Sequence, residues 1–334
     1  MDRIELLQPD DFHVHFRQGA AAAFYAKDAL EAGFARVLVM PNTLPPVTDA
    51  AGLRAYRQLL SESARGLEPL MTFKIKPSLA RDEVAALAQA GAVAGKLYPE
   101  GATTNSEDGV RRLEDADGVF ALMEELDLVL CLHGEEPSAF SMDREAAFLT
   151  GFRALRRRFP RLRIVLEHVS TAEGVQAVLE AGPRTAATIT AHHLCYTFDD
   201  LAGGSLKPHL FCKPLLKRPE DRRALRQAAF SGNPAFFFGS DSAPHARENK
   251  ESALCSAGCY TMPVSLPLLA ELFEAEGRLD RLEPFLAHYG ADFYELPRNT
   301  GKIVLERRPW VVPESYHGVV PPNAGQTLVW QRTH

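Results

Sequence analysis

The run Asp-Phe-His-Val-His-Phe-Arg, residues 11–17, decides how the rest of the chain is interpreted. Successive side chains of a strand point to opposite faces, so His13 and His15 would lie on the same face. Two imidazoles at that spacing can reach one metal ion. Two hydrogen-bonded histidines at the end of a strand are the simpler interpretation, and the spacing by itself favours it. The surrounding pattern has to decide between the two.

Seven further runs of β-forming residues follow the first one at intervals long enough for a helix. The eight predicted strands span residues 11–17, 35–40, 69–76, 94–99, 128–133, 163–169, 186–191 and 235–241. Segments rich in Ala, Leu, Glu and Arg lie between most of them, as at residues 50–63, 81–90, 144–158 and 172–181. Strands separated by helical crossovers form a parallel sheet, and eight of them predict closure into a (β/α)8 TIM barrel.

A doubly wound open sheet is the alternative to a barrel. Such a sheet ordinarily carries a glycine-rich nucleotide loop after an early strand, and this chain has none. Residues 299–302, Asn-Thr-Gly-Lys, match only the end of a phosphate loop. We therefore expect one barrel domain over residues 1–334, with a C-terminal extension from about residue 282 that forms an extra helix and irregular strands.

The composition narrows the possible partners and the location. A net charge of −6, from 37 Lys and Arg against 43 Asp and Glu, disfavours nucleic acid. No apolar stretch approaches the roughly 18 residues that a membrane span needs. An acidic first segment and five cysteines, an odd number, favour the cytoplasm and free thiols over export and disulfides. Cys212, Cys255 and Cys259 fit no structural zinc spacing.

Polar and ionisable residues recur at the carboxyl ends of the predicted strands. They are His13, His15, Asn42, Lys96, His133, His168 and Asp241. In a barrel these ends meet on one face, which carries the active site. Each residue alone has an ordinary interpretation, for example Asp241 as a helix N-cap. Four histidines and an aspartate at four strand ends instead indicate a site for zinc or a similar divalent ion.

Lys96 is the unusual member of this set, because a protonated lysine repels a metal ion. Burial disfavours the charged form, and a neutral amine can capture carbon dioxide as an anionic carbamate. Its two oxygens could then bridge two ions. A lysine that pairs with Asp241, or that extends to the barrel mouth, is the alternative that the sequence chemistry leaves open.

Ten stretches of the chain together resemble the amidohydrolase superfamily and, within it, the dihydroorotase family of the short, single-domain class. They are the run at residues 11–17 and those at residues 39–43 (Val-Met-Pro-Asn-Thr), 95–99 (Gly-Lys-Leu-Tyr-Pro), 102–106 (Ala-Thr-Thr-Asn-Ser), 132–135 (Leu-His-Gly-Glu), 166–171 (Leu-Glu-His-Val-Ser-Thr), 188–194 (Thr-Ile-Thr-Ala-His-His-Leu), 207–217 (Lys-Pro-His-Leu-Phe-Cys-Lys-Pro-Leu-Leu-Lys), 239–247 (Gly-Ser-Asp-Ser-Ala-Pro-His-Ala-Arg) and 255–259 (Cys-Ser-Ala-Gly-Cys). The resemblance extends from the first strand to Gly258 and is looser in the tail.

The resemblance implies a centre with two zinc ions. His13, His15 and Asp241 would bind one ion, and His133 and His168 the other. Lys96, as N6-carboxylysine, would bridge them.

The resemblance also implies a substrate site. Arg17, Asn42 and His245 would hold the substrate carboxylate. The segments at Lys213 and at Ala257-Gly258 would hold the pyrimidine ring through main-chain atoms, and Thr103 and Thr104 would form the tip of a closing loop. The family usually has Leu at the Lys213 position, so Lys is a departure that leaves a main-chain contact unchanged.

The implied activity is the reversible hydrolysis of L-dihydroorotate to N-carbamoyl-L-aspartate, the third step of pyrimidine biosynthesis, with Asp241 as the catalytic base and acid. A homodimer is also implied. The alternatives are another cyclic amidase, such as a hydantoinase, dihydropyrimidinase or allantoinase, and a non-catalytic assembly protein of the same superfamily. Relatives of the first kind generally have extra strands before His-x-His, for which residues 1–12 leave no room. The intact set of ligand positions disfavours the second.

Overall fold

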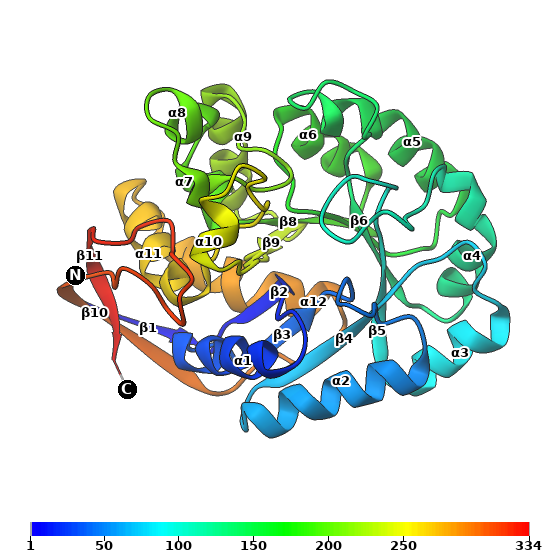
Figure 1. Cartoon of the computed structure of the whole chain (residues 1–334), viewed down its shortest axis with the longest axis horizontal. Coiled ribbons are helices and arrows are strands. Elements are labelled where there is room, and N and C mark those ends of the chain that lie inside the picture. The colour runs from blue at the N-terminus through cyan, green and yellow to red at the C-terminus, as the bar shows by residue number, and fades with distance from the viewer. Residues whose placement is uncertain (1, 334) are drawn as a thin grey trace.

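The computed structural model describes residues 2–333 and contains an eight-stranded parallel sheet (Figure 1). Its strands follow one another in chain order: β2 (Asp10–Val14), β3 (Arg36–Val39), β4 (Glu68–Lys74), β5 (Ala92–Leu97), β6 (Val129–His133), β7 (Ile164–Glu167), β8 (Thr185–Ile189) and β9 (Phe236–Phe238). The predicted (β/α)8 barrel is confirmed. All of the strands except β6 end before the predicted residue, so several of the chemically important residues lie just beyond them.

The barrel closes where the last strand returns to the first. The Asp241 N–H donates to the His13 carbonyl oxygen at 2.8 Å, and the His15 N–H donates to the Ser242 carbonyl oxygen at 3.0 Å. Val14 and Ser242 form a parallel bridge between these hydrogen bonds. The backbone contacts that complete the barrel therefore belong to the same two segments that carry three of the predicted ligands.

Helices surround the sheet, as the ring of coiled ribbons in Figure 1 makes visible. Those that follow the strands in the chain, with the short helices of the loops, are α1 (Ala20–Ala32), α2 (Ala50–Ser63), α3 (Arg81–Gln89), α4 (Asp117–Glu125), α5 (Arg144–Arg158), α6 (Ala172–Ala181), α7 (Ala191–Cys195), α8 (Phe198–Ala202), α9 (Pro219–Phe230), α10 (Arg247–Lys250) and α11 (Ser265–Ala275). Local sequence explains their starts. Asp49 accepts the Gly52 N–H to cap α2, and Thr171 caps α6 in the same way.

The tail closes the end of the barrel opposite the predicted site. After the π-turn Pro284–His288 and helix α12 (Tyr289–Phe293), Tyr294 stacks on Phe12 with ring centroids 4.9 Å apart. Arg163, directly before β7, donates to the Phe293 carbonyl oxygen at 2.9 Å. The amino ends of the strands are thus covered by residues that follow the barrel in sequence.

A second, three-stranded sheet lies beside the barrel and differs from the irregular strands that we expected in the tail. β1 (Arg3–Leu7) pairs antiparallel with β10 (Lys302–Val311), which pairs antiparallel with β11 (Thr327–Thr333). The buried Trp330 joins this sheet to the main core. Within residues 2–333, no helix is long and apolar enough to cross a membrane.

Candidate metal centre

Six of the predicted residues meet at the carboxyl ends of the barrel strands. His13 lies in β2 and His15 directly after it, Lys96 lies in β5, His133 ends β6, His168 follows β7, and Asp241 follows β9. None of these six residues is more than 8 % exposed. Side chains of residues that lie more than 200 positions apart in the sequence therefore meet in one solvent-shielded site.

The first group consists of His13, His15 and Asp241. The Nε2 atoms of the two imidazoles are 3.4 Å apart. Oδ1 of Asp241 lies 3.4 Å from Nε2 of His13 and 3.1 Å from Nε2 of His15. Burial alone would raise the pKa of Asp241, but its close contact with His15 and the neighbouring imidazoles outweighs burial and lowers that pKa. Two nitrogens and a carboxylate oxygen this close form a donor set that suits a divalent ion.

The second group consists of His133 and His168, whose Nδ1 and Nε2 atoms are 3.1 Å apart. The His168 ring also lies against the His13 ring, with centroids 5.1 Å apart. The two groups are therefore adjacent. Burial lowers the pKa of both His133 and His168, which favours the neutral imidazole that a metal ion requires.

Outward-facing nitrogens of three of these rings are held by acceptors. Nδ1 of His13 lies 2.7 Å from Glu167, and Nε2 of His133 lies 2.9 Å from Glu135. Nδ1 of His15 lies 2.8 Å from Oδ1 of Asn42. Each acceptor assigns the ring proton to the outer nitrogen, so the inner nitrogen presents its lone pair to the centre of the site. This arrangement of tautomers is the one that metal-binding histidines need.

Lys96 lies between the two groups in the strand order and is completely buried. Its Nζ has no hydrogen-bond partner among residues 2–333. Burial lowers the pKa of Lys96, and the attraction of Glu167 and Asp241 opposes that shift. An ammonium group without partners is costly in such a place, whereas a neutral amine, or the carbamate formed from it, fits the surrounding imidazoles.

A cavity of about 20 Å³ adjoins the first group. It is lined by His15, Arg17, Asn42, Thr103, Thr104, Lys213, Asp241, Ala243, Ala257 and Gly258. A space of this size admits about one water molecule. Nδ2 of Asn42 donates to the Thr104 carbonyl oxygen at 3.1 Å, and Nδ2 of Asn105 donates to the Asn42 carbonyl oxygen at 2.9 Å. The loop is therefore closed over the cavity and has to open before a ring-sized ligand can enter.

Arg17 lines this cavity, and hydrogen bonds on the far side hold its guanidinium group in place. Its Nε donates to the Pro244 carbonyl oxygen at 2.9 Å, and one terminal nitrogen lies 2.9 Å from Nε2 of His245. His245 lies behind Arg17 and does not line the cavity itself. Burial lowers the pKa of His245 to about 3, so this ring is neutral and adds no charge beside the guanidinium.

Three residues of the site are among the seven non-glycine residues with positive φ between residues 2 and 333. Arg17, His168 and Asp241 adopt φ angles of 63°, 42° and 46°, a left-handed conformation that residues other than glycine seldom adopt. Such strain persists only where surrounding contacts impose it, and it is common at functional sites.

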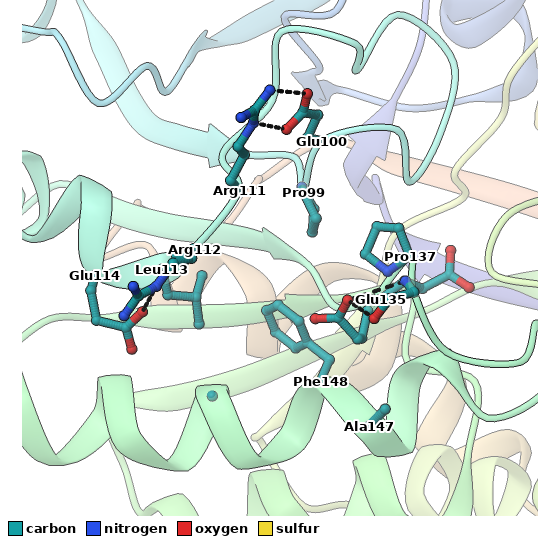
Figure 2. Close-up of a pocket in the computed structure, with 13 residues that line it drawn as sticks. Pro99, Glu100, Arg111, Arg112, Leu113, Glu114, Glu135, Pro137, Ala147 and Phe148 are labelled. Carbon is teal, nitrogen blue, oxygen red and sulfur yellow. Dashed lines mark hydrogen bonds and ion pairs between the residues drawn. The ribbon is translucent and has the colours of Figure 1, made fainter.

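A second cavity, of about 440 Å³, opens beside the centre and is drawn in Figure 2. Glu135 reaches its wall, and Glu100 pairs with Arg111 at its rim. The contact between Glu135 and His133 separates this space from the strand-end groups. The metal centre is therefore identified by its clustered nitrogen and oxygen donor atoms and not by the size of the neighbouring cavity.

Sequence reasoning left Glu135 and Glu167 without a role and did not single out Thr188. Both carboxylates are 1 % exposed, and the Thr188 hydroxyl donates to Glu167 at 2.6 Å. Their places in the sequence could have indicated this role, because Glu167 directly precedes His168 and Glu135 follows His133 by two residues.

Comparisons with known proteins agree with this arrangement. The model of the amidohydrolase family matches residues 11–312. A curated dihydroorotase from Halorhodospira halophila is 47% identical over 342 residues, which cover 99% of each chain. The crystal structure of a dihydroorotase from Saccharomyces cerevisiae in complex with 5-fluoroorotic acid superposes with a TM-score of 0.95 at 34% identity, covering 100% of this chain and 99% of that one. The dihydroorotase from Campylobacter jejuni gives a TM-score of 0.92 at 36% identity, covering 100% of this chain and 98% of that one.

The match extends over the whole barrel and the tail, and the relatives have nearly the same length. The chain belongs to the amidohydrolase family and, within it, to the dihydroorotases.

Proposed function

We propose that this chain hydrolyses L-dihydroorotate to N-carbamoyl-L-aspartate and catalyses the reverse condensation in pyrimidine biosynthesis. The observation that carries the proposal is the convergence of four histidines, three of them hydrogen-bonded through their outer nitrogens, with Asp241 and with Lys96, whose Nζ has no hydrogen-bond partner within residues 2–333. The Arg17 guanidinium lines the cavity that adjoins this group.

The residues at the strand ends would hold two divalent metal ions, zinc in the first instance. His13, His15 and Asp241 would bind one ion, His133 and His168 the other, and carboxylated Lys96 would bridge them. Ions bound there would lower the pKa of a water molecule and polarise the ring amide carbonyl group. The buried, neutral imidazoles and the orphaned Lys96 amine are the features of this chain that support that assignment.

The side chains around the small cavity would bind and orient the substrate. Arg17 would form two charge-assisted hydrogen bonds with the carboxylate, and Asn42 would contribute an amide donor once the loop contact with Thr104 is released. His245 would also contribute to carboxylate binding, and its contact with Arg17 would hold the guanidinium in place. Main-chain atoms near Lys213 and Gly258 would contact the ring. Fixing the substrate in this way aligns the amide carbonyl with the attacking water.

Asp241 would move the proton. Its carboxylate lies between the imidazoles and the cavity, where it can take a proton from the attacking water and deliver it to the departing ring nitrogen. The loop at Thr103 and Thr104, in its closed position, would exclude bulk water while this transfer takes place.

The deciding experiment follows hydrolysis of L-dihydroorotate by the purified protein as isolated, after chelation, and after zinc is restored with bicarbonate. We expect the activity to disappear and to return. Asp241→Ala should abolish turnover while the protein still unfolds cooperatively. Zinc-loaded protein without activity on this substrate would refute the proposal, and turnover of hydantoin or dihydrouracil, which lack the carboxylate that Arg17 would bind, would indicate a different cyclic amidase.

The family also implies a homodimer located in the cytoplasm. Sedimentation velocity of the purified protein and fractionation of the source cells test these two expectations separately from the reaction.

A further inference from the structure

A second cluster of potential ligands lies apart from the strand-end centre. His192 is in α7, Cys212 follows the short turn Pro208–Leu210, and Cys259 lies in the loop that precedes α11. One imidazole nitrogen and the two sulfurs lie within 4.8 Å of one another. None of the three residues is more than 1 % exposed. They come from three segments of the chain that share no motif spacing.

The imidazole of His192 has unmet bonding capacity. Neither of its nitrogens has a hydrogen-bond partner within the described residues 2–333, although the ring is completely buried. The adjacent His193 is different, because its two nitrogens lie 2.8 Å from the Thr190 hydroxyl and 3.2 Å from the Pro214 carbonyl oxygen. A buried polar group without a partner is costly, so His192 requires an explanation that His193 does not. Burial also lowers the pKa of His192 well below its usual range, which keeps a lone pair available.

The two thiols are arranged around the same point in an otherwise apolar cluster. Cys212 and Cys259 pack with Leu201, Leu210 and Leu216. The Cys212 thiol donates to the Pro214 carbonyl oxygen at 3.2 Å, and the Cys259 thiol lies 3.4 Å from the His209 carbonyl oxygen. The neighbouring Cys259 sulfur and burial hold the pKa of the Cys212 thiol well above its usual range, so a nearby cation favours loss of its proton.

The ammonium group of Lys250 lies near the two sulfurs. Nζ of Lys250 is fixed by three carbonyl oxygens, those of Phe211 and Gly258 at 2.8 Å and that of Ser256 at 2.9 Å. Its charge interacts with both Cys212 and Cys259. A fixed ammonium next to two buried thiols lowers the electrostatic cost of forming thiolates there.

We propose that His192, Cys212 and Cys259 form a binding site for a thiophilic closed-shell cation, either Zn²⁺ or Cu⁺, separate from the strand-end centre. Two thiolates and one imidazole are the donor set that both ions prefer. Binding replaces the two thiol protons, which leave to solvent, and forms two metal–sulfur bonds and one metal–nitrogen bond. No electron is transferred.

The position of the site gives it a structural role. Cys212 precedes Lys213 and Cys259 follows Gly258, and both neighbours line the 20 Å³ cavity. The Gly258 N–H donates to the Phe211 carbonyl oxygen at 2.8 Å, so the two segments already touch. An ion that joins Cys212 to Cys259 fixes these two walls to each other and to α7. The site exists independently of the reaction proposed above.

Cobalt(II) is the probe that separates the two centres, because the strand-end centre contains no sulfur. Apo-protein, reduced with a phosphine, is titrated with Co²⁺ and followed by absorbance. We expect a thiolate-to-cobalt charge-transfer band whose final intensity corresponds to one cobalt ion per chain, while the strand-end centre takes up further cobalt without such a band. The band should vanish in Cys212→Ser and in Cys259→Ser, and should weaken and shift in His192→Gln. Cys255→Ser is the matched control and should leave it unchanged.

Competition then identifies the ion. Zn²⁺ and Cu⁺ both displace cobalt from thiolates, so one equivalent of each is added together under anaerobic conditions, and the ion that replaces the cobalt in the isolated protein is the one assigned to the site. Circular dichroism of each variant verifies that it is folded, and Cys212→Ala replaces Cys212→Ser if the serine variant is not. A cobalt-loaded protein without a thiolate band overturns the proposal. So does a band that survives both cysteine variants, or a Cys212–Cys259 disulfide that re-forms in preference to metal binding.

Discussion

Glu167 and His13 face each other inside the barrel, with the carboxylate 2.7 Å from Nδ1, and the Thr188 hydroxyl donates to the same oxygen at 2.6 Å. The barrel wall therefore sets the direction in which the His13 ring presents its inner nitrogen. Residues that hold a ligand in this way matter nearly as much as the ligand.

Glu167→Gln tests that relationship. Glutamine keeps the size of the side chain but removes the charge that fixes the ring proton on Nδ1. We expect metal affinity or kcat/KM to fall by about 10- to 100-fold, measured by metal-buffer titration and steady-state kinetics. Glu173→Gln, on the exposed side of α6, is the control and should behave as the wild type. Equal metal affinity and activity in the two variants would contradict the role assigned to Glu167.

Arg17→Met tests the proposed carboxylate contact. Hydrogen bonds to a charged group contribute about 1.5–3 kcal/mol, which corresponds to a rise in KM of roughly 10- to 150-fold. Metal content should not change, because Arg17 contacts Pro244 and His245 and not the metal-binding atoms. The exposed Arg65→Met is the control. An unchanged KM would remove Arg17 from the substrate site.

The closed loop depends on Asn105, whose side chain donates to the Asn42 carbonyl oxygen at 2.9 Å and whose φ is 56°. Asn105→Gly keeps the backbone conformation accessible and removes the hydrogen bond, at the cost of a more flexible open loop. We expect kcat/KM to fall about fivefold, for the loss of about 1 kcal/mol of closing free energy. Asn105→Ala adds strain at positive φ and should be worse. Identical kinetics in wild type and Asn105→Gly would show that this bond does not hold the loop.

Position 258 requires glycine, because the backbone of Ala243 approaches it too closely for a side chain. At its φ of 152° an added Cβ would lie 2.5 Å from the Ala243 carbonyl oxygen and 3.0 Å from the His245 ring. Gly258→Ala should therefore displace both the cavity wall and the support of Arg17, with a loss of about 1–3 kcal/mol in unfolding free energy and a higher KM. Gly204→Ala, where an added Cβ meets nothing within 4 Å, is the control for thermal unfolding and kinetics. A Gly258→Ala protein as stable as this control would refute the argument.

The barrel could be predicted from sequence because its strands and helices are local and periodic. The predicted helices at residues 50–63, 144–158 and 172–181 coincide with α2, α5 and α6. The convergence of His13, His133, His168 and Asp241 follows from their positions at strand ends, because all parallel strands of a barrel end on the same face.

The three-stranded sheet could not be predicted in the same way. β1 pairs with β10 across almost the whole chain, and β10 contains Arg307, Arg308 and Pro309, with a register shift between Arg307 and Trp310. Neither strand has a pattern that identifies its partner.

The hydrogen bonds between the histidines and the carboxylates that orient them could not be predicted from the sequence either. Whether a carboxylate such as Glu135 faces a histidine or solvent depends on the path of the loop after β6. The cluster of His192, Cys212 and Cys259 has no motif, because its members come from three separate segments. The cysteines are free thiols, as the sequence predicts, but the proximity of the Cys212 and Cys259 sulfurs to the His192 imidazole is visible only in the structure.

The tail segment that stacks Tyr294 on Phe12, together with the pairing of β1 with β10, has a consequence for synthesis. A ribosome that has finished β9 and Asp241 has already translated all six residues of the strand-end centre. The nascent chain still lacks the plug for the opposite end of the barrel and the partner for its own first strand. Folding of the barrel therefore cannot be completed until the tail has been translated. A polypeptide truncated before Lys302 would contain every ligand but would leave the edge of β1 unpaired. We expect such a polypeptide to be recognised by chaperones or proteases.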